Sequence, residues 1–138
     1  MTLELQATPE EIMRAVEALQ AFAQAQGLPE RTIFDLALGL EECGSNIVNH
    51  AYQRDATRTF QVTFDGSVDA FVIELCDDGP AFDPTAAPRK AQAEDDDLLG
   101  GLGIELVRRH LDEISYQREA GKNILRLIKR LKPTKSEA

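Results

Sequence analysis

The 138-residue sequence predicts one α+β domain in two layers, a mixed and mostly antiparallel sheet with helices on one face. The first observation is that apolar residues recur at helical spacing in two long stretches near the start of the chain. The second is that two pairs of alternating segments are each joined by a short turn, as in β-hairpins. Hairpin strands are antiparallel neighbours, and an amphipathic helix buries its apolar stripe against such a sheet. We expect the domain to cover residues 1–132 and residues 133–138 to form a C-terminal tail.

The N-terminal part predicts a strand followed by a helix. Residues 2–6 (TLELQ) alternate and form the strand. Thr8 then caps a helix with Pro9 at its first position and Glu11 three residues after the cap, the pattern of a capping box. Gly27 ends this helix.

The rest of the chain predicts a second helix, a hairpin, a long loop, a third helix and a second hairpin. The second helix covers residues 30–52 and follows Pro29. Residues 77–101 have three prolines and almost no periodicity, which indicates a functional loop, and we place a lid at about 83–100. The third helix covers 103–111. The strands are expected at 57–64, 70–76, 115–118 and 124–131.

The composition restricts the class of protein. The net charge of −9 argues against a nucleic-acid binder, which needs a basic face. No apolar run approaches the ~18 residues of a membrane span, and the N-terminus lacks the pattern of a signal peptide. Cys43 and Cys76 each lie in an apolar element and form no CxxC pair. We therefore expect reduced, buried thiols in a cytoplasmic protein.

The stretch EECGSNIVNHAY at 41–52 places a carboxylate and an amide, Glu42 and Asn46, one helical turn apart. The apolar stripe of this helix lies near the opposite side, and the two polar side chains lie within about 40° of each other. One interpretation is a pair of solvated polar residues. The other is a ligand-facing pair, since an amide oxygen suits Mg²⁺ and a carboxylate can take a proton from a hydroxyl or water.

The stretch DDGPAFDP at 77–84 begins where an apolar strand stops. Asp77 at this strand end can accept a hydrogen bond from an exocyclic amine, and Gly79 lets a flat ring approach the backbone. The alternative is an ordinary Asp-Gly turn.

The stretch GGLGIELV at 100–107 places Gly100, Gly101 and Gly103 before the third predicted helix. The free N–H groups and the dipole at a helix start favour phosphate. The stretch is not a Walker A loop, because no Gly-Lys-Ser/Thr follows, and it is not a Rossmann fingerprint, because no parallel βαβ unit surrounds it.

In this order, the three stretches resemble the N, G1 and G2 boxes of the GHKL ATPase superfamily, whose Bergerat-type fold is a histidine-kinase-like ATPase domain. The string Glu-x-x-x-Asn-x-x-x-His-Ala-Tyr from Glu42 to Tyr52 is most similar to bacterial anti-sigma factors that are also serine kinases. The resemblance covers nearly the whole chain, from the first strand to Lys132. It implies ATP and Mg²⁺ as cofactors.

Transferred residue by residue, the resemblance implies that Glu42 is the general base and Asn46 the Mg²⁺ ligand. Asp77 would bind the adenine amine, and Gly79 would border the ring. Asn123 would line the adenine pocket, and backbone groups of the GGLG stretch would contact the phosphates. The remaining cofactor-binding residues implied by the resemblance are therefore Ala81, Gly100, Gly101, Leu102, Gly103 and Asn123.

The sequence departs from the family pattern at two places. Ala81 stands at the second glycine of the G1 box and narrows the pocket. The lid carries an acidic run at 94–97, which would lie beside the negatively charged phosphates of ATP. Arg89 and Lys90 are the nearest basic residues in the lid. The second departure bears on the efficiency of phosphoryl transfer more than on ATP binding.

The resulting prediction is an ATP- and Mg²⁺-dependent serine/threonine kinase and anti-sigma regulatory factor. It would phosphorylate a STAS-type anti-anti-sigma partner in a partner-switching system, where the added negative charge breaks the complex. The alternative is a nucleotide-gated binding module that sequesters a sigma factor or another regulator with little or no kinase activity. Glu42 favours catalysis, because a pure binder has no need of a base there.

The resemblance also admits a homodimer. A histidine kinase fragment is excluded, because His50 lies on the same helix as Asn46 and no two-helix dimerisation segment precedes it. We interpret His50 and His110 as packing or hydrogen-bonding residues.

Overall fold

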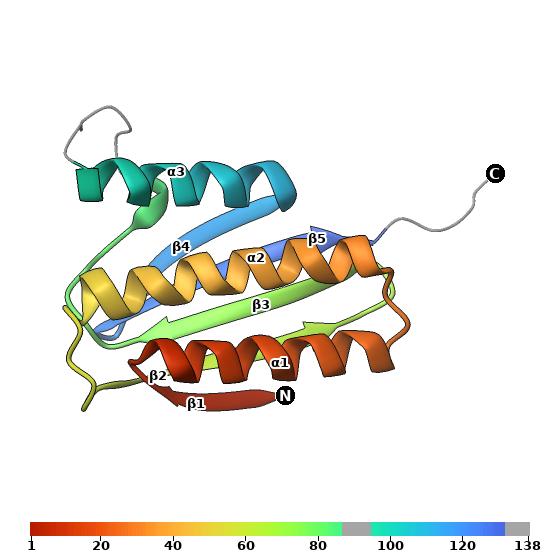
Figure 1. Cartoon of the computed structure of the whole chain (residues 1–138), viewed down its shortest axis with the longest axis horizontal. Coiled ribbons are helices and arrows are strands. Elements are labelled where there is room, and N and C mark those ends of the chain that lie inside the picture. Colours follow the sequence, from red (N-terminus) through yellow and green to blue (C-terminus); the bar gives the residue numbers. More distant parts are fainter. Residues whose placement is uncertain (87–94, 132–138) are drawn as a thin grey trace.

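The five strands form one antiparallel sheet in the order β1-β2-β3-β5-β4 (Figure 1). The computed structural model describes residues 1–86 and 95–131, with residues 95–102 as backbone alone. Every pair of neighbouring strands in this sheet is antiparallel. The strands are β1 (Thr2–Gln6), β2 (Thr59–Gly66), β3 (Ala70–Asp77), β4 (Glu113–Glu119) and β5 (Lys122–Arg130).

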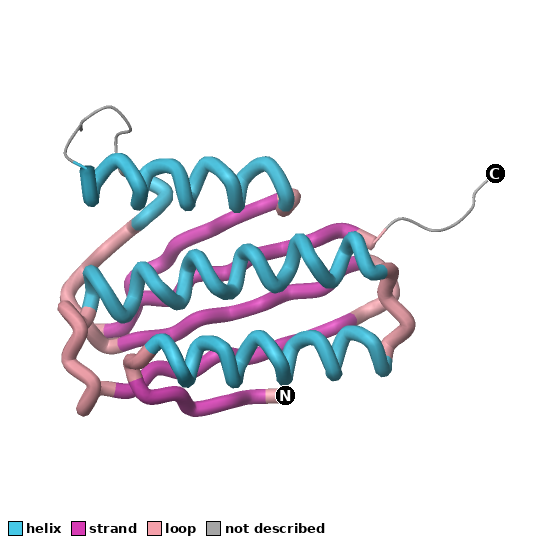
Figure 2. Tube along the Cα trace, viewed as in Figure 1, coloured by secondary structure: helices cyan, strands magenta, loops and turns pink. Residues whose placement is uncertain are grey.

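Three α-helices cover one face of the sheet (Figures 1 and 2). They are α1 (Pro9–Ala25), α2 (Glu30–Asn46) and α3 (Asp95–His110). The central helix α2 packs against both of the others and lies over β3 and β5. Two short turns complete the described elements: the π-helix η1 (Ile47–Ala51) and the 3₁₀ helix η2 (Pro84–Ala86). This two-layer α+β architecture confirms the predicted fold class.

The core lies between the sheet and the helices. In β3 the side chains of Phe71, Ile73 and Leu75 are fully buried and point toward the helices. Since strand side chains alternate between faces, Asp77 continues this buried row at the last position of β3. The strand therefore delivers a carboxylate to the helix-covered side of the sheet.

The cap of α1 follows the prediction with one difference. The Thr8 hydroxyl accepts the N–H of Glu11 at 3.2 Å. The Glu11 carboxylate accepts the N–H of Gln6 at 3.2 Å, where a standard capping box has the N–H of the cap residue itself. Gly27 follows the helix with φ of 80°, the left-handed conformation that ends many helices.

The expectation that the third helix begins at Gly103 is wrong. The helix α3 begins at Asp95, so that Gly100, Gly101 and Gly103 lie within it and do not precede it. Asp95, Asp96 and Asp97 are its first residues. The helix thus extends beyond the glycines toward the N-terminus.

The second helix also ends differently from the prediction. The α-helical part stops at Asn46, and the chain continues as the wider turn η1, in which the N–H of Tyr52 donates to the carbonyl of Ile47 at 2.8 Å. Such π-helical turns often occur at functional sites.

The two thiols are free, as expected, but only Cys43 is buried, while Cys76 is half-buried on the other side of the sheet. No helix in the described part of the chain is long and apolar enough to cross a bilayer.

Candidate functional site

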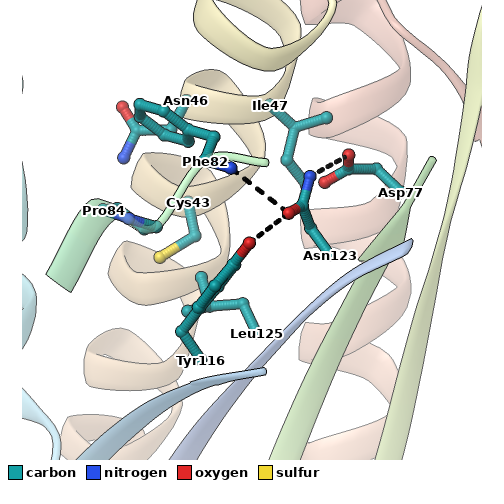
Figure 3. A pocket seen from close by; sticks show the side chains of 9 residues that line it. All are labelled: Cys43, Asn46, Ile47, Asp77, Phe82, Pro84, Tyr116, Asn123 and Leu125. Atoms are coloured by element: carbon teal, nitrogen blue, oxygen red, sulfur yellow. Dashed lines mark hydrogen bonds between the residues drawn. The ribbon is translucent and has the colours of Figure 1, made fainter. Parts of the chain in front are cut away.

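A pocket opens at the end of β3, between the sheet, the end of α2 and the loop that follows β3 (Figure 3). It encloses about 270 Å³ of space, part of it open to solvent. The wall is mainly apolar, with polar groups from α2, β3, β4 and β5. The lining residues are Cys43, Asn46, Ile47, Asp77, Phe82, Pro84, Tyr116, Asn123 and Leu125.

Asp77 is the buried carboxylate of this pocket, with 5% of its surface exposed. Its Oδ1 atom accepts two hydrogen bonds, one from the N–H of Gly79 and one from the amide of Asn123, both at 2.9 Å. Among the described residues, no donor binds the second oxygen, Oδ2. The pocket therefore offers one carboxylate oxygen to a ligand that donates a hydrogen bond.

Asn123 lies opposite Asp77, because β3 and β5 pair in a register that joins these two residues. It is 3% exposed, and its amide lies among polar groups of β3, β4 and the loop after β3 (Figure 3). The sequence prediction that Asn123 belongs to the same pocket as Asp77 thus agrees with the geometry.

Asn46 enters the pocket from the last turn of α2. Its side-chain amide makes no hydrogen bond to any residue in the described ranges, which leaves the amide oxygen available to a ligand. The helix thus presents Asn46 to the pocket while its apolar side packs on the sheet.

Glu42 lies one turn before Asn46, half-buried between α2 and α3. A Cβ atom at Gly103 of α3 would collide with Glu42 Oε1, so the two helices meet at this carboxylate. Burial, and secondarily the neighbouring charge of Glu41, raises the pKa of Glu42 above its ordinary value. A carboxylate with a raised pKa is a better general base near neutral pH than an ordinary one.

The turn after β3 is held by Tyr52. The Tyr52 hydroxyl donates to the carbonyl of Thr59 at 2.6 Å and accepts the N–H of Asp78 at 3.1 Å. Arg58 lies over the Tyr52 ring at 4.4 Å and pairs with the Asp78 carboxylate at 2.9 Å. Burial raises the pKa of Tyr52 to about 12, so the hydroxyl keeps its proton.

Gly79 lies where a side chain would be crowded. A Cβ atom there would come to 3.0 Å from the carbonyl oxygen of Ala51 and to 3.2 Å from the Tyr52 ring. Ala81, at the second glycine position of the G1-like stretch, is exposed and does not line the pocket. The close contact with η1 thus explains the glycine at 79, and the space around 81 tolerates alanine.

The structure therefore brings Asn46, Asp77 and Asn123 together in one pocket, with Glu42 one helical turn away. Gly79 lies at the edge of this site through its bond to Asp77. Gly100, Gly101 and Leu102 belong to the stretch described as helical backbone alone. Arg89 and Lys90 lie outside the described residues.

The sequence prediction missed Phe82 and Tyr116 as pocket residues. Phe82 stacks on His50 with ring centroids 5.7 Å apart, which confirms the packing role expected for His50. His110 likewise binds the Leu106 carbonyl through Nδ1 at 2.8 Å and contacts Phe34. The hairpin centred on Gly121 contained a signal for Tyr116, because a tight turn there puts Arg118 opposite Asn123 and Tyr116 opposite Leu125.

No group of three or more His, Cys, Asp or Glu side chains in the described ranges is arranged to hold a metal ion. A metal at this site would therefore take most of its ligands from a bound molecule or from water.

Comparison with known proteins places the chain in a family. Residues 5–129 match the model of the histidine kinase-like ATPase domain. The chain is 33% identical over 134 residues to the serine/threonine-protein kinase BtrW of Bordetella bronchiseptica, covering 96% of this chain and 94% of that protein. It is 27% identical over 125 residues to the serine-protein kinase RsbW of Bacillus subtilis, covering 86% and 78%.

The fold also has a solved counterpart. A chain in the crystal structure of the SiaB-SiaC complex from Pseudomonas aeruginosa superimposes with a TM-score of 0.60 at 18% identity, covering 95% of this chain and 89% of that one. This likeness is one of fold.

Proposed function

Because the chain belongs to the histidine kinase-like ATPase family, we propose that the protein is an ATP- and Mg²⁺-dependent serine/threonine kinase and anti-sigma regulatory factor. Its phosphoryl acceptor is a STAS-type anti-anti-sigma partner. One observation carries the proposal: α2 presents Asn46 to a pocket with a free Asp77 oxygen, and holds Glu42 one turn away. The relatives that this chain matches over most of their length are protein kinases by name.

The pocket residues take the following roles in this proposal. Asp77 accepts a hydrogen bond from the adenine amine through Oδ2, and Asn123 lines the adenine pocket. Gly79 borders the ring. The apolar wall, which includes Ile47 and Leu125, suits a flat heteroaromatic ring.

The donor set also fits Mg²⁺. This ion prefers oxygen ligands, keeps several waters and is usually bound by one or two protein groups together with substrate phosphates. Asn46 offers one such oxygen at the pocket, and we assign it as the protein ligand.

When bound, ATP with Mg²⁺ supplies the γ-phosphoryl group. Glu42 orients the acceptor hydroxyl and takes its proton while the hydroxyl oxygen forms the new bond to phosphorus and ADP leaves with the electrons of the broken bond. Positioning by α2 is the main contribution of the protein, since phosphoryl transfer needs little covalent help.

The backbone N–H groups of Gly100, Gly101, Leu102 and Gly103 contact the phosphates in this proposal. These groups lie inside α3, where each N–H faces the carbonyl four residues earlier. Their release requires the start of α3 to unwind, and the glycines lower the cost of that change, because glycine is a poor helix former.

The test is phosphoryl transfer in solution. The protein is incubated with γ-labelled ATP, Mg²⁺ and candidate STAS-domain proteins, beside Asn46→Ala and the matched control Asn49→Ala, an exposed amide one turn further on. We expect label on a serine or threonine of one partner with the intact protein and the control, and none with Asn46→Ala. Absence of label on every candidate, with ATP bound, contradicts the kinase.

The second candidate function is a nucleotide-gated module that sequesters a sigma factor or another regulator. Tight partner binding without label would favour it. A homodimer and a cytoplasmic location complete the proposal, and sedimentation of the purified chain tests the first of these.

A further inference from the structure

Asn123 has an unusually complete set of hydrogen bonds for a pocket residue. Its Oδ1 atom accepts three donors: the N–H of Phe82 at 3.2 Å, Nη1 of Arg118 at 3.1 Å, and the hydroxyl of Tyr116. Its Nδ2 atom donates to Asp77 Oδ1 and to the carbonyl of Pro80, both at 2.9 Å. Both ends of the amide are thus occupied (Figure 3).

These donors fix which end of the amide faces Asp77. With the amide turned by half a rotation, its NH₂ would face two fixed donors, the N–H of Phe82 and Nη1 of Arg118, and the Tyr116 hydroxyl would have to turn and accept. Its carbonyl would then face the Asp77 carboxylate. That arrangement leaves buried polar groups unsatisfied, which is costly. Tyr116 and Arg118, both on the edge strand β4, therefore direct the Asn123 N–H toward Asp77.

The fixed amide in turn determines what the pocket accepts. Asp77 Oδ1 is filled by Asn123 and Gly79, so Oδ2 remains as a carboxylate oxygen that can only accept. A base with an amino group at this position donates to it, whereas a base with a carbonyl there meets an acceptor with an acceptor.

Arg118 also restrains the loop that borders the pocket. Its Nη1 atom donates to the carbonyl of Gly79 at 2.8 Å, on the turn between Asp77 and Phe82. The β4–β5 hairpin therefore holds both the Asp77 carboxylate, through Asn123, and the neighbouring loop, through Arg118.

We propose that Tyr116 and Arg118 are positioning residues that set the preference of the pocket for a 6-aminopurine over a 6-oxopurine, by locking the Asn123 amide against Asp77. The proposal rests on the proposed function in that it takes the ligand to be a purine nucleotide. It adds two residues outside the three motifs that select which purine base the pocket binds.

The test compares ADP with inosine diphosphate (IDP), which differs in the 6-position. Dissociation constants are measured by titration calorimetry for the intact chain, Tyr116→Phe, Arg118→Met and the double variant. The phenylalanine keeps the ring on the pocket wall and removes the hydroxyl alone. Arg126→Met is the matched control, because it removes an exposed arginine of β5 that lies 3.9 Å from Glu74, away from the pocket.

We expect the intact chain and Arg126→Met to bind ADP at least about tenfold more tightly than IDP, the effect of one hydrogen bond to a charged group. In the double variant the ADP-to-IDP ratio falls by about tenfold, mainly through weaker ADP binding, and each single variant gives part of this fall. Thermal melting of every variant is recorded, and the single variants carry the test if the double variant does not fold.

If the variants bind ADP and IDP more weakly by the same factor, or if the ratio of the two dissociation constants is unchanged, this proposal is overturned. The proposed function then stays intact, because Tyr116 and Arg118 would support only the fold and not the choice of base. Failure of the intact chain to bind either nucleotide overturns the proposed function, and this proposal with it.

Discussion

The carboxylate of Glu42 on α2 lies directly against Gly103 of α3. It occupies the space that a side chain at position 103 would need. The third glycine of the GGLG stretch is therefore explained by contact with the proposed base. A Cβ atom at 103 would require the Glu42 carboxylate to move, because the Cβ atom would collide with Oε1.

Gly103→Ala is expected to slow phosphoryl transfer about tenfold or more by displacing Glu42, since small misplacements of a reacting group are costly. Stability is expected to change little, because alanine is the better helix former by about 1 kcal/mol and offsets part of the collision. Single-turnover transfer and thermal melting measure the two effects.

Gly44→Ala is the matched control for this substitution. It places a Cβ atom on α2 at 3.4 Å from the Ile12 side chain, an ordinary contact. It is expected to keep the transfer rate of the intact protein. A Gly103→Ala protein that transfers as fast as Gly44→Ala would refute the role of the contact.

Glu42→Gln is expected to reduce phosphoryl transfer by about 10²- to 10⁴-fold, the usual contribution of a general base. The affinity for ADP is expected to stay unchanged, because Glu42 does not line the pocket. Calorimetry with ADP separates binding from chemistry, and a parallel loss of both would assign Glu42 to binding.

The rate of transfer is expected to rise with pH through the raised pKa of Glu42, since the base acts in its ionised form. Burial is the larger cause of the raised pKa of Glu42, and the negative charge of Glu41 is the second. Glu41→Gln is therefore expected to move the acidic limb of the pH–rate profile to lower pH. A limb that stays in place would show that another group controls it.

The same pKa shift has a consequence for stability. A carboxyl with a pKa raised in the folded state holds its proton more tightly when folded, so its ionisation lowers stability as the pH rises. Glu42→Gln is therefore expected to gain stability relative to the intact protein between acidic and neutral pH, measured by urea unfolding at several pH values. A constant difference would contradict the shift.

Lys129→Met is expected to destabilise the fold by about 3 kcal/mol, because it leaves a buried carboxylate unpaired. Lys129 Nζ lies 3.1 Å from Asp35 Oδ2 and donates to the carbonyl of His110 at 2.8 Å, so it ties α2, β5 and the end of α3 together. Asp35 Oδ1 is buried without a hydrogen-bond partner in the described structure.

Two controls sharpen this prediction in urea unfolding experiments. Arg126→Met removes an exposed pair and is expected to cost less than about 0.5 kcal/mol. Asp35→Leu combined with Lys129→Met is expected to recover most of the loss, since an apolar pair replaces a buried ion pair at little cost. Similar small costs for Lys129→Met and Arg126→Met would contradict the account.

The parts of the fold that depend on local pattern were predictable from the sequence. Alternation in β3 and the turn at Gly121 fixed the strands, and the helical phase of α2 turned Asn46 away from the apolar stripe. These residues reach the pocket because the strand end and the helix end are set by local rules. Asp77 is the clearest example, since it continues the buried row of its own strand.

The remaining features depend on tertiary contacts or on competing local effects. A π-turn adds no residue pattern of its own, so the end of α2 was placed too far along the chain. The start of α3 was placed too late, because glycine is a poor helix former and yet three glycines lie within this helix. The hydrogen bonds of Asn123 to Tyr116 and Arg118 arise from strand register and could not be weighed before the sheet order was known.

The most direct test of the kinase assignment is intact-protein mass spectrometry of a STAS-domain partner after a single turnover with ATP and Mg²⁺. With the intact protein we predict one added phosphate on a serine or threonine of the partner, and with Glu42→Gln no phosphate in the same time. A partner that binds tightly and stays unmodified, or one that is modified equally by Glu42→Gln, would contradict the account.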